Sequence, residues 1–345
     1  MERKITPCGR FAPSPTGSMH LGNVWTALLS WLYIRSQSGR MILRIEDLDP
    51  DRSKEEYTKQ LIADLAWLGL DYDEGPGKEK PQHTYRQSER QAIYQFYLQK
   101  LQARGLLYPC FCSRQELHSL AGAPHVGEAY SIYRGTCRSL SEQERQARLA
   151  SGRRPALRLQ VFDETIRFTD GLYGAIAENV ALSVGDFILR RSDGVFAYQF
   201  AVVIDDALMG ISHVVRGADL LDSTARQIYL YRLLGFKTPE FIHVPLLCGD
   251  DGVRLSKRHN DVSLAELKQR GVTSEAIIGY LAYLAGWREQ AEPISAVKLL
   301  PYFRLGTLPK GNIIIQEAEI TAFLSAGFAK KQDCLRQRAN TIESY

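Results

Sequence analysis

The hydrophobic positions of the first fifty residues predict a strand, a helix and a second strand. Residues 8–12 form a short run that favours a buried strand. Apolar side chains then recur every three or four residues, the stripe of an amphipathic helix, at Val24, Ala27, Leu28, Trp31 and Leu32. Gly39 stands where this helix would end, and MILRIEDLD at 41–49 favours the second strand. This order predicts a βαβ unit with parallel strands and a right-handed crossover.

The remaining pattern predicts an α/β fold that is interrupted once. Between residues 108 and 171 the periodicity breaks into cysteines, short polar helices and turn residues, which indicates an insertion. Residues 186–217 favour several β-rich segments separated by turns at Asp193-Gly194 and Met209-Gly210, and a further strand is expected near 241–247. Four other stretches have a helical pattern: 54–68, 88–104, 223–234 and 265–287.

Composition narrows the class of protein. Of the 345 residues, 45% are apolar and 24% charged, which is ordinary for a soluble protein of two or three domains. The chain has no apolar run of membrane-spanning length, and its first residues, MERKITPCGR, do not resemble a secretory signal. We therefore expect a cytoplasmic protein without a membrane partner. The net charge of +4 permits an acidic partner such as RNA but does not require one.

The turn before the first helix, FAPSPTGSMHLGN, combines prolines, glycines and a histidine. The N-terminus of a helix presents unpaired N–H groups, and glycine lets the backbone approach a ligand closely. His20, two residues before Gly22, is placed to reach a phosphate held there. A plain helix-entry turn explains HLGN equally well when it is considered alone.

A second candidate anion site is the loop GVRLSKRHND at 252–261. It holds three cations within five residues, Arg254, Lys257 and Arg258, with Ser256 among them. Such a serine-lysine pair can clamp a polyphosphate while negative charge builds on it. The alternative, and the more usual explanation of such a run, is a solvated charged loop.

Together the two segments resemble a known pair of motifs. HLGN is similar to the HIGH motif, and RLSKR to the KMSKS motif, of class I aminoacyl-tRNA synthetases. GRFAPSPTGSMHLGN, RIEDLDPDR, FAYQFAVVIDDALMGISHVVRGADLL and LSKRHNDVSL closely resemble the glutamyl-tRNA synthetase family. The resemblance runs from Gly9 to about Trp287, and it implies that the anion is the triphosphate of ATP.

The resemblance also implies a fold and its domains. The fold class would be α/β, with a Rossmann-type parallel-sheet catalytic domain, a zinc-bearing insertion and a small helical C-terminal region that contacts the RNA stem. Residues 1–107 and 176–248 would form the two halves of the Rossmann domain, and 108–175 the connective insertion. Residues 249–345 would hold the KMSKS-like loop, the stem-contact helices and a tail.

The resemblance implies residue roles as well. Glutamate would attack the α-phosphate of ATP, which is accompanied by Mg²⁺, and catalysis would consist of positioning and charge stabilisation. The catalytic residues would be His20, Gly22, Ser256 and Lys257. ATP would contact His20, Gly22, Asn23 and Lys257. Glutamate would contact Arg10, Phe11, Ala12, Pro13, Ser14, Glu46, Tyr198 and Arg216. Without the resemblance, the preferred interpretation would be a cross-strand ion pair for Arg44 and Glu46 and a core aromatic for Tyr198.

The cysteines suggest one structural zinc. The chain has six, too scattered for a disulfide scaffold, but Cys110, Cys112 and Cys137 fall within one 28-residue stretch. Buried free thiols are the alternative. Spacing leaves the fourth ligand open among His118, His125, Tyr130 and Tyr133. In shortened relatives of the family the site reads C-x-C…Y-x-x-x-C, which implies Tyr133.

The length of the last region indicates which branch of the family the chain resembles. Only 87 residues follow Arg258, too few for a typical anticodon-binding domain after the helical segment GVTSEAIIGYLAYLAGW. The chain therefore resembles the truncated branch that activates glutamate without tRNA and transfers it to queuosine in the anticodon of tRNA(Asp). We expect a monomer. The alternatives are a short synthetase that charges the 3′ end of tRNA(Glu), a non-catalytic tRNA-binding relative and a small-molecule nucleotidyltransferase.

Overall fold

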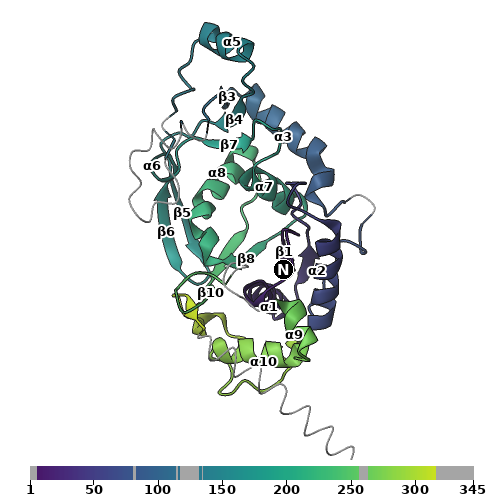
Figure 1. The fold of residues 1–345 in the computed structure, drawn as a ribbon. Coiled ribbons are helices and arrows are strands. Elements are labelled where there is room, and N and C mark those ends of the chain that lie inside the picture. The colour runs from purple at the N-terminus through teal and green to yellow at the C-terminus, as the bar shows by residue number, and fades with distance from the viewer. Residues whose placement is uncertain are drawn as a thin grey trace, which may run out of the picture.

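The computed structural model describes residues 6–80, 83–113, 116, 132–133, 135–255 and 263–315. The molecule is elongated: helix α5 (Glu142–Ala150) lies at one end and helix α10 (Ser274–Leu284) near the other, with the parallel strands between them (Figure 1). None of the described helices is long and apolar enough to cross a bilayer.

Two parallel strand pairs form the centre of the fold. Strand β1 (Cys8–Phe11) pairs with β2 (Arg40–Leu43), and β8 (His213–Gly217) pairs with β9 (Glu240–Val244). The backbone N–H of Ser212 donates to the Cys8 carbonyl over 2.9 Å, which brings the two pairs edge to edge. A short parallel pair, β10 (Leu247–Cys248) with β11 (Ile313–Ile314), follows. The predicted βαβ unit with parallel strands is confirmed, although β2 is shorter than the predicted strand.

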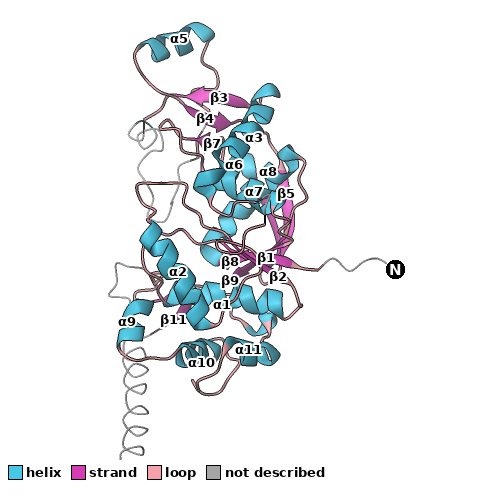
Figure 2. Cartoon of the chain, turned by 90° about the vertical axis from the view of Figure 1, so that its right-hand side faces the viewer, coloured by secondary structure: helices cyan, strands magenta, loops and turns pink. Residues whose placement is uncertain are grey.

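The side chains of successive strand residues point to opposite faces of the sheet and therefore pack into two separate hydrophobic cores. Val215 and Val244 pack in one core with helix α1 (Leu21–Arg35) and α10. Val214 and Phe241 pack in the other core, with three helices: α3 (Gln91–Ala103), α7 (Tyr198–Leu208) and α8 (Thr224–Leu234). Figure 2 shows these two groups of helices on opposite sides of the strands. The parallel strands are thereby covered by helices on both faces.

Three predicted helices are confirmed. Helix α2 (Glu55–Leu68) ends at Gly69 and α8 at Gly235, both in the left-handed conformation that glycine adopts without strain. Before α3, the first turn is a 3₁₀ segment, η1 (Gln87–Arg90). A second 3₁₀ segment, η2 (Ala218–Ser223), precedes α8.

Two predictions are wrong. Residues 198–208, expected to be β-rich, form α7. Its residues 200–206 are all buried, and a short apolar run that is buried on every side gives no periodicity to tell helix from strand. Residues 265–287, expected as one helix, form α9 (Leu264–Gln269) and α10, because the Thr273 side chain caps a new helix start by accepting from the Ala276 N–H.

The insertion contains more sheet than the sequence indicates. Strand β3 (Leu107–Cys110), at the start of the insertion, pairs with β4 (Ala156–Leu159), and β4 pairs with β7 (Phe187–Arg190), which follows the insertion; both pairs are antiparallel. A hairpin of β5 (Thr165–Asp170) and β6 (Gly174–Asn179) follows β4 and spans the predicted boundary at 175/176. The short helices α6 (Val180–Ser183) and α11 (Ala296–Leu299) and the 3₁₀ segments η3 (Leu300–Tyr302) and η4 (Leu305–Thr307) complete the described elements.

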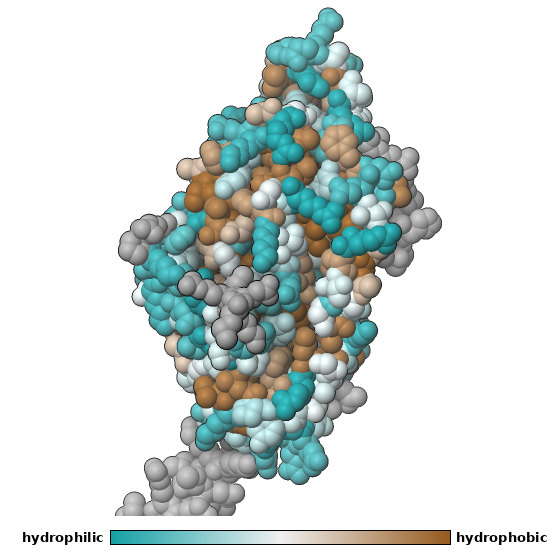
Figure 3. Space-filling model, turned by 180° about the vertical axis from the view of Figure 1, so that it is seen from behind, coloured by the Kyte–Doolittle hydropathy of each residue, from teal (hydrophilic) through white to brown (hydrophobic). Residues whose placement is uncertain are grey.

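Helix α5 stands apart at the tip of the insertion. None of its residues is buried, and hydrophilic side chains cover this tip when the molecule is seen from behind, whereas apolar patches appear lower on the same face (Figure 3). Ser141 accepts from the Glu144 N–H, and the Glu144 carboxylate accepts from the Ser141 N–H, which closes a capping box.

Candidate active site

The HLGN turn lies where the crossover from β1 enters α1, at the carboxyl end of the parallel strands. His20 is the N-cap residue of α1, and its N–H donates to the Asn23 side-chain oxygen over 3.2 Å. A Cβ at Gly22 would lie 3.1 Å from the His20 imidazole and 3.6 Å from the Leu255 carbonyl. Glycine at this position therefore lets both the ring and a second loop approach the helix start, where N–H groups attract anions.

The structure brings the two ends of the KMSKS-like loop to this turn. Leu255 packs beside Gly22, and Ser263 forms a β-bridge with His20. The Leu264 N–H donates to the Met19 carbonyl over 2.8 Å. Ser256 and Lys257 lie outside the described residues, so their roles stay predictions, but the segments on both sides of them flank the HLGN turn.

The segment from Arg10 to Ser14 runs along the continuation of β2. The Arg44 N–H donates to the Phe11 carbonyl and the Glu46 N–H to the Pro13 carbonyl, each over 3.0 Å. Phe11, Ala12 and Pro13 are half-buried, whereas Ser14 is exposed. This backbone pairing aligns the predicted glutamate-binding segment with Glu46.

Buried charges gather behind this segment. The Asp206 carboxylate, on α7, accepts from Arg10 Nε over 3.3 Å and from Arg44 Nη1 over 2.6 Å. Arg44 Nη2 also donates to Glu46 Oε1 over 3.0 Å, so the alternative of an Arg44–Glu46 ion pair is realised. The pair does not use Glu46 fully, because Oε2 accepts no hydrogen bond from the described residues.

The two carboxyl groups of this cluster have different electrostatic surroundings. Burial raises the pKa of Glu46, although the cations of Arg44 and Arg10 oppose the shift. Burial acts in the same direction on Asp206, but Arg10 and Arg44 together outweigh it and hold the pKa of Asp206 below its ordinary value. Asp206 is therefore a firm counter-ion for the two arginines, and Glu46 is the less fully neutralised carboxylate.

Tyr198 and Arg216 approach the same cluster from α7 and β8. Burial raises the pKa of Tyr198 to about 12; the field of Glu46 adds to this shift and that of Arg216 opposes it. Arg216 is only 4% exposed. Its Nη1 donates to Gln227 Oε1 over 2.7 Å and its Nε to His243 Nε2 over 2.9 Å. Tyr198 thus lies within the field of this charged cluster, and its contact with glutamate stays a prediction.

A second buried carboxylate, Asp205, connects this cluster to neighbouring elements. It is fully buried and accepts from Arg90 Nε over 2.6 Å, from Gln87 Nε2 over 2.7 Å and from the Tyr94 hydroxyl over 2.9 Å. Arg44 Nε lies 3.9 Å from the same carboxylate. Asp205 therefore ties η1 and α3 to the arginine that holds Glu46 and Asp206.

Sequence reasoning missed these supporting residues. The signal was present in VVIDDALM, where Asp205 and Asp206 interrupt an apolar run, and in FIHVPLL, where His243 does the same. A charged or polar residue inside a buried run needs a partner in the fold. These side chains hold the residues that were predicted to bind glutamate.

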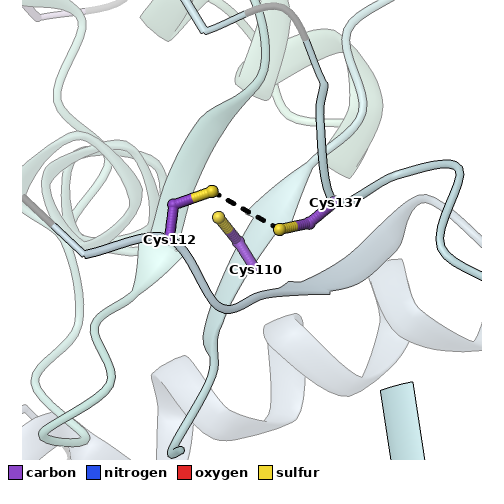
Figure 4. Close-up of side chains that lie close together, drawn as sticks. All are labelled: Cys110, Cys112 and Cys137. Atoms are coloured by element: carbon purple, nitrogen blue, oxygen red, sulfur yellow. Dashed lines mark hydrogen bonds between the residues drawn. The ribbon is translucent and has the colours of Figure 1, made fainter. Parts of the chain in front are cut away.

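The three predicted cysteine ligands come together in the structure (Figure 4). The sulfurs of Cys110, Cys112 and Cys137 all lie within 4.8 Å of one another, and those of Cys112 and Cys137 are 3.5 Å apart. The Tyr133 hydroxyl is 3.5 Å from Cys110 Sγ and 3.7 Å from Cys112 Sγ, and it accepts from the Cys137 N–H over 2.8 Å. This group can hold a metal ion.

Three of the separations among these four atoms are those expected of a tetrahedral site. A zinc ion with Zn–S of about 2.3 Å and Zn–O of about 2.0 Å sets its ligand atoms roughly 3.5 to 3.8 Å apart. The distances that join Tyr133 to two cysteines fall in that range. Of the other candidates for the fourth ligand, His118, His125 and Tyr130 lie outside the described residues.

Comparison with known proteins adds family information to this geometry. A family model for the catalytic domain of class I tRNA synthetases (E and Q) matches residues 8–320. The glutamyl-Q tRNA(Asp) synthetase of Symbiobacterium thermophilum is 52% identical over 323 residues, covering 93% of this chain and 99% of that protein. The glutamyl-Q tRNA(Asp) synthetase of Nitratidesulfovibrio vulgaris is 47% identical with the same coverage.

Full-length ligases match over a smaller share of their own length. The glutamate–tRNA ligase of Sulfurihydrogenibium sp. is 44% identical over 90% of this chain and 65% of the ligase. A crystal structure of a glutamate tRNA ligase from Elizabethkingia meningosepticum, in complex with its amino acid, superposes with a TM-score of 0.78 at 30% identity, over 92% of this chain and 68% of that chain. This chain belongs to the class I tRNA synthetases for glutamate and glutamine, in the branch of the glutamyl-Q tRNA(Asp) synthetases.

Proposed function

We propose that this protein is an ATP-dependent ligase that activates L-glutamate to glutamyl-adenylate without tRNA. It then transfers the glutamyl group to queuosine in the anticodon of tRNA(Asp). It acts as a monomer in the cytoplasm.

The observation that supports this proposal most strongly is the distribution of charge around Glu46 and Arg216. Arg216 is buried and, among the described residues, forms no ion pair. A buried cation without a counter-ion is costly unless a ligand supplies the missing charge. Glu46, whose second oxygen has no donor in the described part, offers the opposite charge nearby. A cation for a carboxylate and a carboxylate for an ammonium fit an acidic amino acid.

The first chemical step needs no nucleophile from the protein. A carboxylate oxygen of glutamate attacks the α-phosphorus of ATP, the bond from that phosphorus to the bridging oxygen breaks, and pyrophosphate leaves with the electron pair. Arg10 and Arg216 bind the glutamate, while His20 and Lys257 stabilise charge on the phosphoryl oxygens. Mg²⁺ accompanies the nucleotide and neutralises part of its charge.

The second step transfers the glutamyl group to a hydroxyl of the cyclopentenediol of queuosine. The hydroxyl oxygen attacks the carbonyl carbon of the adenylate, AMP leaves, and the hydroxyl proton is released. The names of the relatives that are 52% and 47% identical support this acceptor. The alternative is the 3′ end of tRNA(Glu), which the more distant glutamate–tRNA ligases favour.

We further propose that the insertion holds one structural zinc. Cys110, Cys112 and Cys137 would supply three thiolates and Tyr133 the fourth ligand, as the tetrahedral spacing supports. The helices after residue 263 would contact the RNA stem. The zinc would fix the chain between β3 and α5 and take no part in the chemistry.

Two measurements test the proposed function. The purified protein should catalyse glutamate-dependent exchange between ATP and pyrophosphate with Mg²⁺ and without RNA. Labelled glutamate should then join tRNA(Asp) that carries queuosine and not the same tRNA made without it, and nuclease digestion should release glutamyl-queuosine. Recovery of glutamyl-adenosine from tRNA(Glu) would instead establish the alternative acceptor. Absence of exchange would rule out the adenylate chemistry.

A further inference from the structure

The hydrogen bonds of Arg216 leave little of its guanidinium unused. A guanidinium carries five N–H donors. Besides its bonds to His243 and Gln227, Arg216 donates through Nη2 to the Thr224 hydroxyl over 2.9 Å and to the Leu220 carbonyl over 3.3 Å. Within the described part of the chain, one Nη1 hydrogen is left for a ligand. The direction of that hydrogen depends on the partners that fix the plane of the group.

The hydrogen bonds of His243, another partner of Arg216, define the protonation state and tautomer of its imidazole. Its ring is fully buried, and Nε2 accepts from Arg216 Nε over 2.9 Å. An arginine can only donate, so Nε2 carries no proton and the proton lies on Nδ1. Nδ1 is 2.6 Å from Asp170 Oδ2, to which it donates. The imidazole is therefore a neutral link between a carboxylate and a guanidinium.

Asp170 reaches this position from the insertion. It ends β5 and is 2% exposed, and its carboxylate accepts from the N–H groups of Leu172, Tyr173 and His243. The next residue, Gly171, donates its N–H to the Phe241 carbonyl over 2.9 Å. A Cβ at Gly171 would lie 2.8 Å from Ile242 Cγ1, so glycine lets the hairpin turn lie directly on β9.

The interposed imidazole makes Arg216 different from the other arginines of the site. Arg10 and Arg44 contact the Asp206 carboxylate directly and share its negative charge. A carboxylate in direct contact with Arg216 would likewise compete with a substrate carboxylate. A neutral ring holds the guanidinium in place and leaves its charge available. Arg216 also lies over the Phe241 ring, 5.1 Å from its centroid, which fixes the same plane from one face.

Building on the proposed function, we propose that Asp170 and His243 are positioning residues for amino-acid recognition. The turn of the β5–β6 hairpin holds, through one neutral imidazole, the orientation in which Arg216 offers its remaining N–H to a carboxylate of glutamate. The insertion thereby contributes to the affinity for glutamate although it does not touch the amino acid.

The test compares KM and kcat in ATP–pyrophosphate exchange. His243→Phe keeps a ring but removes the acceptor, and Asp170→Asn removes the charge that holds the ring. Each should raise the KM for glutamate on the order of tenfold or more, the loss of one oriented charge-assisted hydrogen bond. The KM for ATP and kcat should stay within about twofold, since only ground-state binding is lost. His243→Gln, whose amide oxygen can replace Nε2, should restore the KM for glutamate to within about threefold of the parent.

Asp186→Asn is the matched control. Asp186 is a buried carboxylate directly before β7 and accepts from the Tyr108 hydroxyl and the Val161 N–H, each over 2.7 Å, with no hydrogen bond to Arg216 or its partners. It should leave the KM for glutamate unchanged. A parental KM in folded His243→Phe or Asp170→Asn, or an equal rise in Asp186→Asn, would overturn the proposal. If His243→Phe does not fold, Asp170→Asn and His243→Gln decide alone. Failure of the proposed function can be distinguished from failure of this proposal, because the parent protein itself would then show no ATP–pyrophosphate exchange.

Discussion

Asp205→Asn removes one negative charge from a fully buried ionic cluster while keeping the shape of the side chain. Arg90 is 2% exposed and has Asp205 as its carboxylate partner, and Arg44 lies 3.9 Å away. The asparagine amide can still accept from Arg90 and satisfy Gln87 after a flip of the Gln87 amide. The loss is therefore mainly electrostatic. Leaving a buried charge uncompensated costs about 3 to 5 kcal/mol, and the retained hydrogen bonds place this variant near the lower end, at about 3 kcal/mol.

Urea unfolding followed by tryptophan fluorescence measures this loss, because Trp25 and Trp31 of α1 are both buried. With an m-value of about 3 kcal/mol per molar urea, the midpoint should fall by about 1 M. Asp163→Asn is the control, an exposed carboxylate that accepts one bond from Asn179, and should change stability by less than about 0.5 kcal/mol. A loss below about 1 kcal/mol in Asp205→Asn would refute the reasoning that Arg90 depends on this charge.

Three further outcomes are expected. Lys257→Ala should slow ATP–pyrophosphate exchange on the order of a hundredfold, because it removes a preorganised charge donor. Lys298 is exposed, and Lys298→Ala should exchange at the parental rate. A parental rate in Lys257→Ala would exclude the catalytic role of Lys257. Protein purified without added zinc should contain about one zinc per chain, and Tyr133→Phe should lose it to a chelator faster than the parent; equal rates would exclude tyrosine as a ligand. Burial lowers the pKa of His243, so below its ordinary value of 6.5 the unfolded chain binds a proton that the folded chain does not. The free energy of unfolding should therefore fall as the pH is lowered from about 7.5 to about 5.5, and it should fall less in His243→Gln. Burial also lowers the pKa of His213, which accounts for only part of this pH dependence. The same pH dependence in His243→Gln as in the parent would contradict a buried neutral ring.

Elements with a one-sided environment could be predicted from the sequence. Helix α2 has an apolar face and an exposed face, and Gly69 marks its end, so its pattern carries both its type and its boundary. Helix α7 carries neither, because both its faces are buried and its valines and isoleucine also suit a strand. The antiparallel strands of the insertion are short and pair across gaps of many residues, which no local pattern records.

Of the candidate site, only the residues expected to contact glutamate could be predicted, and not the residues that hold them in place. Arg10, Glu46 and Arg216 come from the family resemblance, and the structure places them in one electrostatic cluster. Asp206, which contacts both Arg10 and Arg44, lies more than 160 residues from each of them in the chain. Asp170, which contacts His243, comes from the β5–β6 hairpin. Such partners are chosen by the packing of distant elements, so the sequence shows that a buried Asp or His needs a partner without showing which one.

Helix α5 has a consequence for the local stability of the molecule. Nine residues are too few for an isolated helix to be stable in water, and α5 buries none of its side chains, so its capping box and local charge pairs must supply its helicity. Its free energy of opening is then close to zero and separate from that of the two cores. The amide hydrogens of α5 should exchange with deuterium nearly as fast as those of an unprotected peptide, whereas those of α1 should exchange only when the whole molecule unfolds. The tip is thus the place where a fluorescent label or a short peptide tag can be inserted without cost to the rest of the fold.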